Sequence, residues 1–438
     1  MTALPIFKDG IGASPKAQPD RIGRGERLAY LAAFAVLICV RLPDVLLEGR
    51  FWAEEGRDFF HKAWTLPWSQ ALFAPHEGYL NIIANGGALL ARYLVPLEFA
   101  PYVTTAIGLL FQLCPALVLL TARDDWLQRR VVLVLALLLI LLPPSSEEVW
   151  LQTLHSQFHL ALCAALILTL KSETGWIEIF RRGLLLIGAL SGPGAAVLLP
   201  LFVLRAILDR SSPRAMEALV LGIGVALQFV LFYTAIPQRN HPMTLPLLLS
   251  VITAHHIVLP LMGTEAAKSI LSDLYRTVMS GPVPLWSQIA AVCAFVLMVT
   301  GLVLRRQADF VWLFLAGCTV MVVSYSGALV DLVTLIAVDG APRYGYVPQA
   351  IFNLVVLGLA ATGHDVLAKL AWGLVAWIVV TGAQSYFFTW DIISHGPDWR
   401  SELAIWRTDP SHKLKIWPGG WEMALPREGA DPPPQSRP

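Results

Sequence analysis

Two pairs of adjacent glutamates stand out in a chain that is otherwise poor in charge. Glu54 and Glu55 lie in "FWAEEGRDFF", a few residues after the first long apolar run, and Glu147 and Glu148 lie in "PPSSEEVW", between two later runs. Carboxylate oxygens bind divalent cations, and a single carboxylate can take a proton from an attacking hydroxyl group as a general base. One such pair is most often part of a solvated loop, but two pairs on one side of a membrane indicate a site.

The first pair is the better candidate for catalysis, and further polar side chains follow it in the sequence. Of its two carboxylates we favour Glu54, because it follows the apolar run Phe51-Trp52-Ala53. Shielding from water would raise its pKa toward that of a useful base. The polar residues that follow are assigned to substrate binding: Arg57, His76, Glu77, Tyr79 and Asn81.

A third group of candidate residues lies in "DGAPRYGYVP", just before a late apolar run. Arg343 can hold a phosphate group through two parallel hydrogen bonds, and Tyr344 adds a hydroxyl group beside it. The alternative is that both residues only anchor the chain at the membrane interface, where aromatic and basic residues are common.

The second acidic pair is assigned to a metal, and other metal signals in the sequence are weak. Glu147 and Glu148 are the expected ligands of a divalent cation. His155 and His159 are one helical turn apart and either bind a metal or, more commonly, hydrogen-bond to neighbouring helices. The five cysteines all fall inside apolar runs, so neither a disulfide framework nor a zinc site is expected.

The composition predicts an all-α protein that crosses a membrane many times. Of the 438 residues, 56% are hydrophobic and 14% are charged, and the mean hydropathy is +0.61. Apolar runs recur that can cross about 30 Å of hydrocarbon, and we expect about eleven transmembrane helices. The predicted spans are 28–46, 100–121, 131–143, 153–170, the pair 183–191 and 194–206, 215–235, 286–304, 309–330, 347–361 and 366–388.

The distribution of basic residues orients these spans. More than half of the 32 lysines and arginines lie in the short segments 1–27, 122–130, 171–182, 205–214, 305–308 and 362–369. Basic residues are enriched on the cytoplasmic side of membrane proteins, so the N-terminal tail 1–27 is predicted to be cytoplasmic. The segments predicted outside are 47–99, 144–152, 236–285, 331–346 and the C-terminal tail 389–438.

Two apolar stretches need a special interpretation if this orientation is to hold. The stretch 78–94 carries Asn81, Asn85 and Arg92, and we expect a juxtamembrane helix that lies on the outer surface or dips into the membrane. The run 183–206 contains "SGPG" at 191–194, where proline removes a backbone donor. Two short helices that turn at SGPG are therefore expected, and irregular backbone at this depth indicates a nearby cavity.

The C-terminal tail, within the domain 389–438, is rich in tryptophan. Its segment "HKLKIWPGGWEMAL" predicts a short strand, a turn and a second strand folded back over the outer face. Aromatic rings stack on sugars and also anchor polar segments at bilayer surfaces. We expect the tail to pack onto the outer cavity through Trp399, Trp406, Trp417 and Trp421.

The order of these elements resembles the GT-C superfamily of membrane glycosyltransferases, including the protein O-mannosyltransferases and the lipid A aminoarabinose transferases. The shared pattern is an acidic pair after the first span, a surface helix and a second acidic site after the third span, over roughly residues 28–210. The segment "GALSGPGAAVLLP" at 188–200 is similar to the family's break between short helices, although its lysine is absent. The family's first motif usually has an aspartate, whereas this chain has two glutamates, and this difference leaves metal dependence open.

The resemblance implies a GT-C-like transmembrane domain over 28–388 in a bacterial inner (plasma) membrane. It also implies transfer of a sugar from a polyprenyl-phosphate donor to a glycan, lipid or protein acceptor on the outer face. The implied base or metal ligand is Glu54 or Glu55, and Arg343 with Tyr344 would hold the lipid phosphate. The alternative is a transporter or flippase of lipid-linked glycans, but transporters place ionisable groups near the bilayer midplane. The net charge of +1 provides no argument for a nucleic-acid partner.

Overall fold

The computed structural model describes residues 22–232 and 243–427, and this part of the chain is almost entirely helical. Of the sequence predictions, those for residues 1–21 and 428–438, and for 236–242 of the loop 236–285, lie outside the described residues. The helices of the first half are α1 Arg24–Arg41, α2 Pro43–Glu48, α3 His61–Thr65, α4 Trp68–Leu72, α5 Ile82–Leu94, α6 Ala100–Gln112, α7 Cys114–Thr121, α8 Arg130–Leu141, α9 Ser156–Thr169, α10 Trp176–Ala189, α11 Pro193–Ala196, α12 Leu199–Asp209 and α13 Ser212–Phe232.

The second half continues the helical bundle and ends in a small mixed tail. Its elements are α14 Leu245–Thr253, α15 Leu259–Ser280, α16 Leu285–Arg305, α17 Ala308–Ser326, α18 Arg343–Ala361, α19 Val366–Tyr386, α20 Asp391–Ser394, α21 Trp399–Thr408, β1 Leu414–Ile416 and β2 Trp421–Met423. The two strands pair antiparallel, which confirms the predicted strand, turn and strand. Two π-helical segments, η1 Glu55–Phe60 and η5 Ala254–Val258, interrupt the α-helical pattern.

The protein has the helices of a multi-pass membrane protein. Within the described residues, seven helical segments are long and apolar enough to cross a membrane, and up to eight if a bent helix pair counts as one span. The seven are Leu97–Thr121, Ser212–Val230, Leu245–Ser280, Leu285–Arg305, Ala308–Ser326, Arg343–Ala361 and Val366–Tyr386. Judged by helix length and apolar composition, the described residues therefore contain fewer candidate spans than the eleven or so that were expected.

The candidates differ from the predicted spans in two ways: three short predicted spans and the bent pair are not among the seven, and one segment that was not predicted as a span is. The predicted spans 28–46, 131–143 and 153–170 form α1, α8 and α9, which are not among these candidates. The 12 residues of α8, for example, extend only about 18 Å. Conversely, Leu245–Ser280 lies in the segment 236–285, which was predicted to be an outer loop. It forms a long helical segment with an apolar first half. The segment is bent at Gly263, whose φ is +74°.

The bend at SGPG is formed as predicted. The helix Trp176–Ala189 and the following segment Pro193–Asp209 meet at an angle of 116°. Gly192 at the break has a φ of +132°, a backbone conformation that residues other than glycine rarely adopt. The stretch 78–94 forms only the 13-residue helix α5, which is capped by the Asn81 side chain and is not among the candidate spans.

The core of the bundle is built around α9 and α18, which are the most deeply buried helices. Nearly every residue of both is buried. The contact between α17 and α18 depends on small residues, because a Cβ added to Gly317 would come within 2.9 Å of the Ile351 side chain. Small residues let two membrane helices approach closely, and this close packing fixes the ends of α17 and α18.

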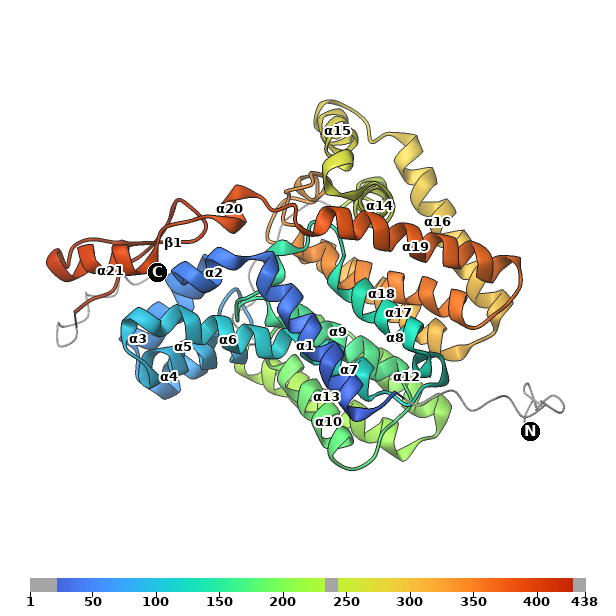
Figure 1. The fold of residues 1–438 in the computed structure, drawn as a ribbon, viewed down its shortest axis with the longest axis horizontal. Coiled ribbons are helices and arrows are strands. Elements are labelled where there is room, and N and C mark those ends of the chain that lie inside the picture. Colours follow the sequence, from blue (N-terminus) through green and yellow to red (C-terminus); the bar gives the residue numbers. More distant parts are fainter. Residues whose placement is uncertain (1–21, 233–242, 428–438) are drawn as a thin grey trace.

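The segment after α2 and the C-terminal tail gather at one end of the molecule, which we call the loop end. Figure 1 shows that α3, α4, α5, α21 and β1 lie there. The tail is joined to the loop by backbone pairing, since the Trp417 N–H donates to the Phe51 carbonyl at 3.1 Å and the Ala53 N–H donates to the Trp417 carbonyl. Trp399, Trp406 and Trp417 are buried and Trp421 is partly buried, so the tail packs through its tryptophans, but of the four only Trp421 lines the cavity described below.

Substituting Trp399 by alanine is expected to destabilise the protein by about 3–5 kcal/mol, the usual cost of removing a large buried aromatic side chain. Trp399 is 2% exposed, packs edge-on against Phe51 with ring centroids 5.1 Å apart, and donates from Nε1 to the Leu97 carbonyl at 2.9 Å. The measurement is thermal unfolding of the detergent-solubilised protein. Trp176→Ala is the matched control, because Trp176 is 67% exposed, and an equal shift in both variants would contradict the prediction.

The predicted orientation is open to a direct test by cysteine labelling in intact cells. In a cysteine-free background, we expect an impermeant thiol reagent to label Ser69→Cys in α4 but not Asp125→Cys between α7 and α8. Both positions are at the surface, so accessibility to the reagent depends on the side of the membrane. Labelling of the Asp125 variant alone would reverse the proposed topology.

Candidate functional site

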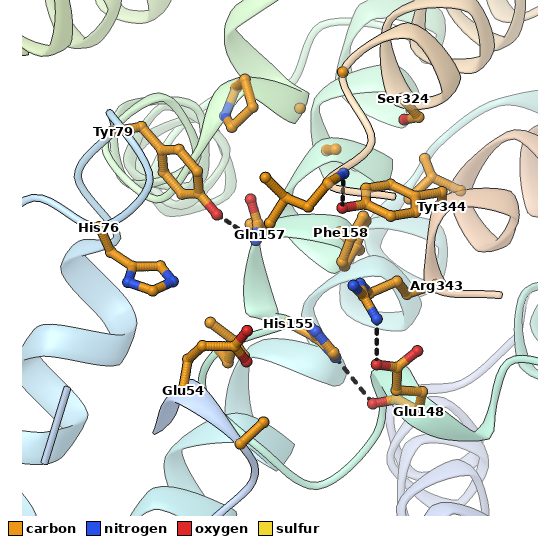
Figure 2. A pocket seen from close by; sticks show the side chains of 18 of the residues that line it. Glu54, His76, Tyr79, Glu148, His155, Gln157, Phe158, Ser324, Arg343 and Tyr344 are labelled. Carbon is orange, nitrogen blue, oxygen red and sulfur yellow. Dashed lines mark hydrogen bonds and ion pairs between the residues drawn. The ribbon is translucent and has the colours of Figure 1, made fainter. Parts of the chain in front are cut away.

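A cavity of about 320 Å³ lies where the ends of α9, α17 and α18 meet the loop end. Figure 2 shows the polar side chains that point into it. Six parts of the chain contribute to its walls, and some of them are more than 300 residues apart in the sequence. They are 52–54, 76–79, 148–161, 193–197, 320–347 and the turn of the tail hairpin, which contributes Pro418 and Trp421.

Six of the candidate site residues that were predicted from the sequence line the cavity. Those that line it are Glu54, His76, Tyr79, Glu148, Arg343 and Tyr344. The ones that do not line it are Glu55, Arg57, Glu77, Asn81 and Glu147. The SGPG segment also reaches the cavity through Pro193 and Gly194, in agreement with the expectation that irregular backbone borders a cavity.

One wall of the cavity carries an ion pair. Arg343 donates from Nη1 to Glu148 at 2.6 Å, and the Arg343 side chain retains 21% exposure. Its guanidinium carbon lies 5.0 Å from the Tyr344 ring. The Tyr344 hydroxyl accepts a hydrogen bond from the Leu329 N–H at 3.0 Å. A guanidinium has five N–H donors, so the pair with Glu148 orients Arg343 and leaves donors for an anionic ligand.

The opposite side carries Glu54 and a short turn that contains His76 and Tyr79 (Figure 2). The backbones of His76 and Tyr79 exchange hydrogen bonds of 2.9 and 3.1 Å, and the His76 ring packs on Phe59 at 4.8 Å. Burial, chiefly, lowers the pKa of His76 below its ordinary value, so the imidazole is neutral near pH 7. Tyr79 accepts a hydrogen bond from Gln157 at 3.3 Å.

The position of Glu54 depends on an unusual backbone and on the tail. Ala53 has a φ of +40°, in a region that L-residues rarely adopt, and its N–H is held by the Trp417 carbonyl. Glu54 directly precedes the π-helical segment η1, and π-helical turns are frequent at functional sites. The tail therefore helps to hold the Glu54 backbone at the edge of the cavity.

Glu55, the other candidate for catalysis, does not line the cavity and is held by structural hydrogen bonds. The side chain is fully buried and accepts hydrogen bonds from the Thr153 N–H at 2.7 Å, from the Thr153 hydroxyl and from the Trp52 N–H. Burial raises the pKa of this carboxyl group. The expectation that Glu54 is the more shielded of the pair is wrong, because Glu54 is partly exposed in the cavity.

Replacing Glu55 by alanine is expected to destabilise the loop end. Each buried donor that loses its partner costs about 1–3 kcal/mol, and the change leaves donors on Thr153 and Trp52 without their acceptor. Glu55→Gln keeps one acceptor oxygen and is expected to retain most of the stability. Thermal unfolding and proteolysis of the two variants measure the difference, and wild-type stability of the alanine variant would contradict this role.

The predicted cation site at Glu147 and Glu148 is not formed. Glu147 is 1% exposed and pairs with the buried Arg41 at 3.4 Å, whereas Glu148 pairs with Arg343. Each carboxylate thus faces its own arginine, because adjacent residues in the short helical turn point in different directions. Across the described residues, no group of three or more histidine, cysteine, aspartate or glutamate side chains has an arrangement that could hold a metal ion. These residues do not fit a divalent cation.

Three further residues that were assigned to substrate binding do not line the cavity. Asn81 is buried, where it caps α5 and donates to the Leu154 carbonyl at 3.0 Å. Glu77 is exposed and does not line the cavity. Arg57 is exposed and stacks on Trp421 at 4.2 Å, so it supports a cavity residue from outside.

Several cavity residues were not selected from the sequence. Gln157 lies at the start of α9 inside an apolar run, and a polar amide there was the only available signal. His155, predicted either to bind a metal or, more commonly, to hydrogen-bond to a neighbouring helix, hydrogen-bonds through Nδ1 to the Glu148 carbonyl at 3.0 Å. This contact makes Nδ1 the donor and leaves Nε2 as an acceptor in the neutral ring. Trp52 and Phe158 complete the aromatic part of the lining.

No protein-family model matches the chain, and no curated protein matches its sequence. The resemblance to the GT-C superfamily stays a prediction.

Proposed function

We propose that the protein is a GT-C-like glycosyltransferase that transfers a sugar from a polyprenyl-phosphate donor to an acceptor hydroxyl group. The acceptor is a glycan, a lipid or a protein. The observation that carries the proposal is the meeting of Glu54 and Arg343 in one cavity, from opposite walls. A carboxylate can accept a proton and an arginine can hold a phosphate, and this reaction needs both.

The proposed reaction inverts the anomeric carbon. The acceptor oxygen bonds to this carbon from the face opposite the phosphate, while the bond between the carbon and the phosphate oxygen breaks. Glu54 takes the hydroxyl proton, and the electron pair of the broken bond leaves with the polyprenyl phosphate. Arg343 stabilises the negative charge that develops on the leaving group. No step requires a metal ion.

The remaining lining of the cavity supports this assignment of roles. Tyr79, Gln157 and the neutral His76 are uncharged hydrogen-bonding groups on the side of Glu54, suited to the hydroxyl groups of a sugar. Trp52 and Trp421 add aromatic faces of the kind that stack on sugar rings. The wall beside Arg343 is apolar, with Val320, Val323 and Val347, and suits the first isoprene units of the donor.

The same proposal includes the topology and location of the protein. The short helices α1, α8 and α9 cross the membrane together with the longer ones, giving about eleven crossings. The N-terminus is cytoplasmic, the loop end lies outside, and the membrane is the inner membrane of a bacterium. In this arrangement the cavity is at the level of the outer phosphate groups, where a membrane-bound donor and a polar acceptor can meet.

The decisive experiment is an assay of the purified protein with a panel of radiolabelled polyprenyl-phosphate sugars and candidate acceptors. We expect release of polyprenyl phosphate together with a labelled acceptor. If no sugar is transferred but labelled donor crosses a vesicle bilayer that contains the protein, the protein is a flippase and the proposal is overturned.

A further inference from the structure

A second groove, of about 580 Å³, lies where the starts of α1 and α10 meet the end of α7. Figure 1 shows these three helices in the same part of the bundle. The groove shares none of its described lining residues with the cavity of Glu54. It is therefore a separate feature, and the proposed glycosyl transfer assigns no role to it.

The groove lies at the end of a membrane span. α7 forms the last part of the candidate span Leu97–Thr121, and Thr121 itself lines the groove. Trp176, the first residue of α10, lines it too and is 67% exposed. An exposed tryptophan beside basic residues is typical of the headgroup level of a bilayer. The groove is therefore placed where the apolar core of the membrane gives way to headgroups and water.

Two arginines at the start of α1, Arg24 and Arg27, line the groove and retain donors for a ligand. Arg24 is exposed, and its side chain makes no hydrogen bond or ion pair with any other described residue. Arg27 donates to the backbone carbonyl of Leu120 near the end of α7, which is a neutral acceptor. Since each guanidinium has five N–H donors, both side chains can still bind an anion.

The carboxylates nearest in sequence do not compensate these two charges. The acidic residues in the first turns of α1 and α10 are Glu26 and Glu178. Glu26 pairs with Arg130 at 2.7 Å, and Glu178 pairs with Arg182. The described lining of the groove contains no carboxylate. In the sequence before Ile22, three basic residues accompany two acidic ones, so that segment does not reverse the sign of the charge.

The rest of the lining favours a ligand with an apolar part. Seven of the ten described lining residues are apolar, so a small hydrated anion would leave most of the groove without a polar partner. Leu28 lies one helical turn after Arg24, is 59% exposed and lines the same groove. Charged and apolar binding groups thus occur within one groove, which is the pattern that an anionic amphiphile requires.

We propose that this groove binds an anionic phospholipid of the leaflet that adjoins the start of α1. Arg24 and Arg27 hold the phosphate through charge-assisted hydrogen bonds, Trp176 flanks the polar headgroup, and an acyl chain lies along Leu28 and Leu31. In the proposed orientation of the protein this is the cytoplasmic leaflet. The site is independent of the proposed glycosyl transfer.

Native mass spectrometry of the full-length protein in detergent tests the proposal without any assay of activity. Dioctanoyl phosphatidylglycerol is the probe, and dioctanoyl phosphatidylcholine and inorganic phosphate are the comparison ligands. We expect phosphatidylglycerol to bind more tightly than either of them. Arg24→Gln should weaken this binding by about fivefold, the usual contribution of one basic residue at an anionic membrane surface. The double variant Arg24→Gln/Arg27→Gln should weaken it by roughly twentyfold.

The single variant and a control keep the result interpretable. Arg24→Gln removes a side chain on which no described contact depends, so it should fold even if the double variant does not. Lys369→Gln removes an exposed charge near the start of α19, outside the groove, and should leave lipid binding unchanged.

Three outcomes would overturn the proposal. The first is equal binding of the two lipids by the wild type, or unchanged binding of phosphatidylglycerol in the arginine variants. The second is binding of inorganic phosphate as tight as that of the lipid, which would remove the reason to assign a lipid. The third is a dimer that the double variant dissociates, because the groove would then be occupied by a second copy of the chain.

Discussion

Glu54→Gln is expected to reduce the rate of sugar transfer by about 10²–10⁴-fold, the usual effect of removing a general base. The amide keeps the size of the side chain but cannot take the hydroxyl proton. Glu54 is partly exposed in the cavity, so the protein should fold and bind donor as the wild type does. Single-turnover kinetics with labelled donor measures the chemical step, and donor binding is measured separately.

A matched control distinguishes this role from a general effect of charge. Glu77→Gln removes the same charge from the same loop, but Glu77 is exposed and outside the cavity. We expect wild-type turnover in that variant. Wild-type turnover in Glu54→Gln as well would rule out Glu54 as the base, and donor binding that fell as far as the rate would indicate a role in recognition.

Arg343→Gln is expected to lower kcat by about 10²–10³-fold, the typical effect of removing one group that stabilises developing charge. The physical reason is that the phosphate leaves with a full negative charge, which a neutral amide stabilises poorly. Arg343→Lys keeps the charge but loses the planar, paired donors, and an intermediate rate is expected. Steady-state kinetics with a polyprenyl-phosphate sugar separates kcat from KM.

The loss of Arg343 also leaves Glu148 without its ion-pair partner in a nearly buried position, and this effect must be separated from catalysis. An unpaired buried charge is strongly destabilising, so Arg343→Gln is expected to lower the unfolding temperature. The double variant Arg343→Gln/Glu148→Gln removes both charges and should recover much of that stability. If it also recovers the rate, Arg343 acts only by compensating Glu148 and does not stabilise the leaving phosphate.

Much of this protein is determined by local patterns in its sequence. Apolar runs dictate membrane helices, the glycines and proline of SGPG dictate a break, and the turn "WPGGW" between alternating residues dictates the tail hairpin. Polar side chains at the ends of apolar runs are driven to the same boundary of the bundle. For this reason Glu54, His76, Tyr79, Glu148, Arg343 and Tyr344 could be selected from sequence and are found around one cavity.

Only the tertiary structure decided which member of each acidic pair faces that cavity. Glu55 is turned inward by the donors of Thr153, and Glu147 by Arg41, and each partner is about a hundred residues away in the sequence. Two adjacent glutamates are equivalent in a linear sequence pattern, but the folded chain gives them different neighbours. A buried carboxylate must lie where hydrogen bonds or an opposite charge offset its loss of hydration.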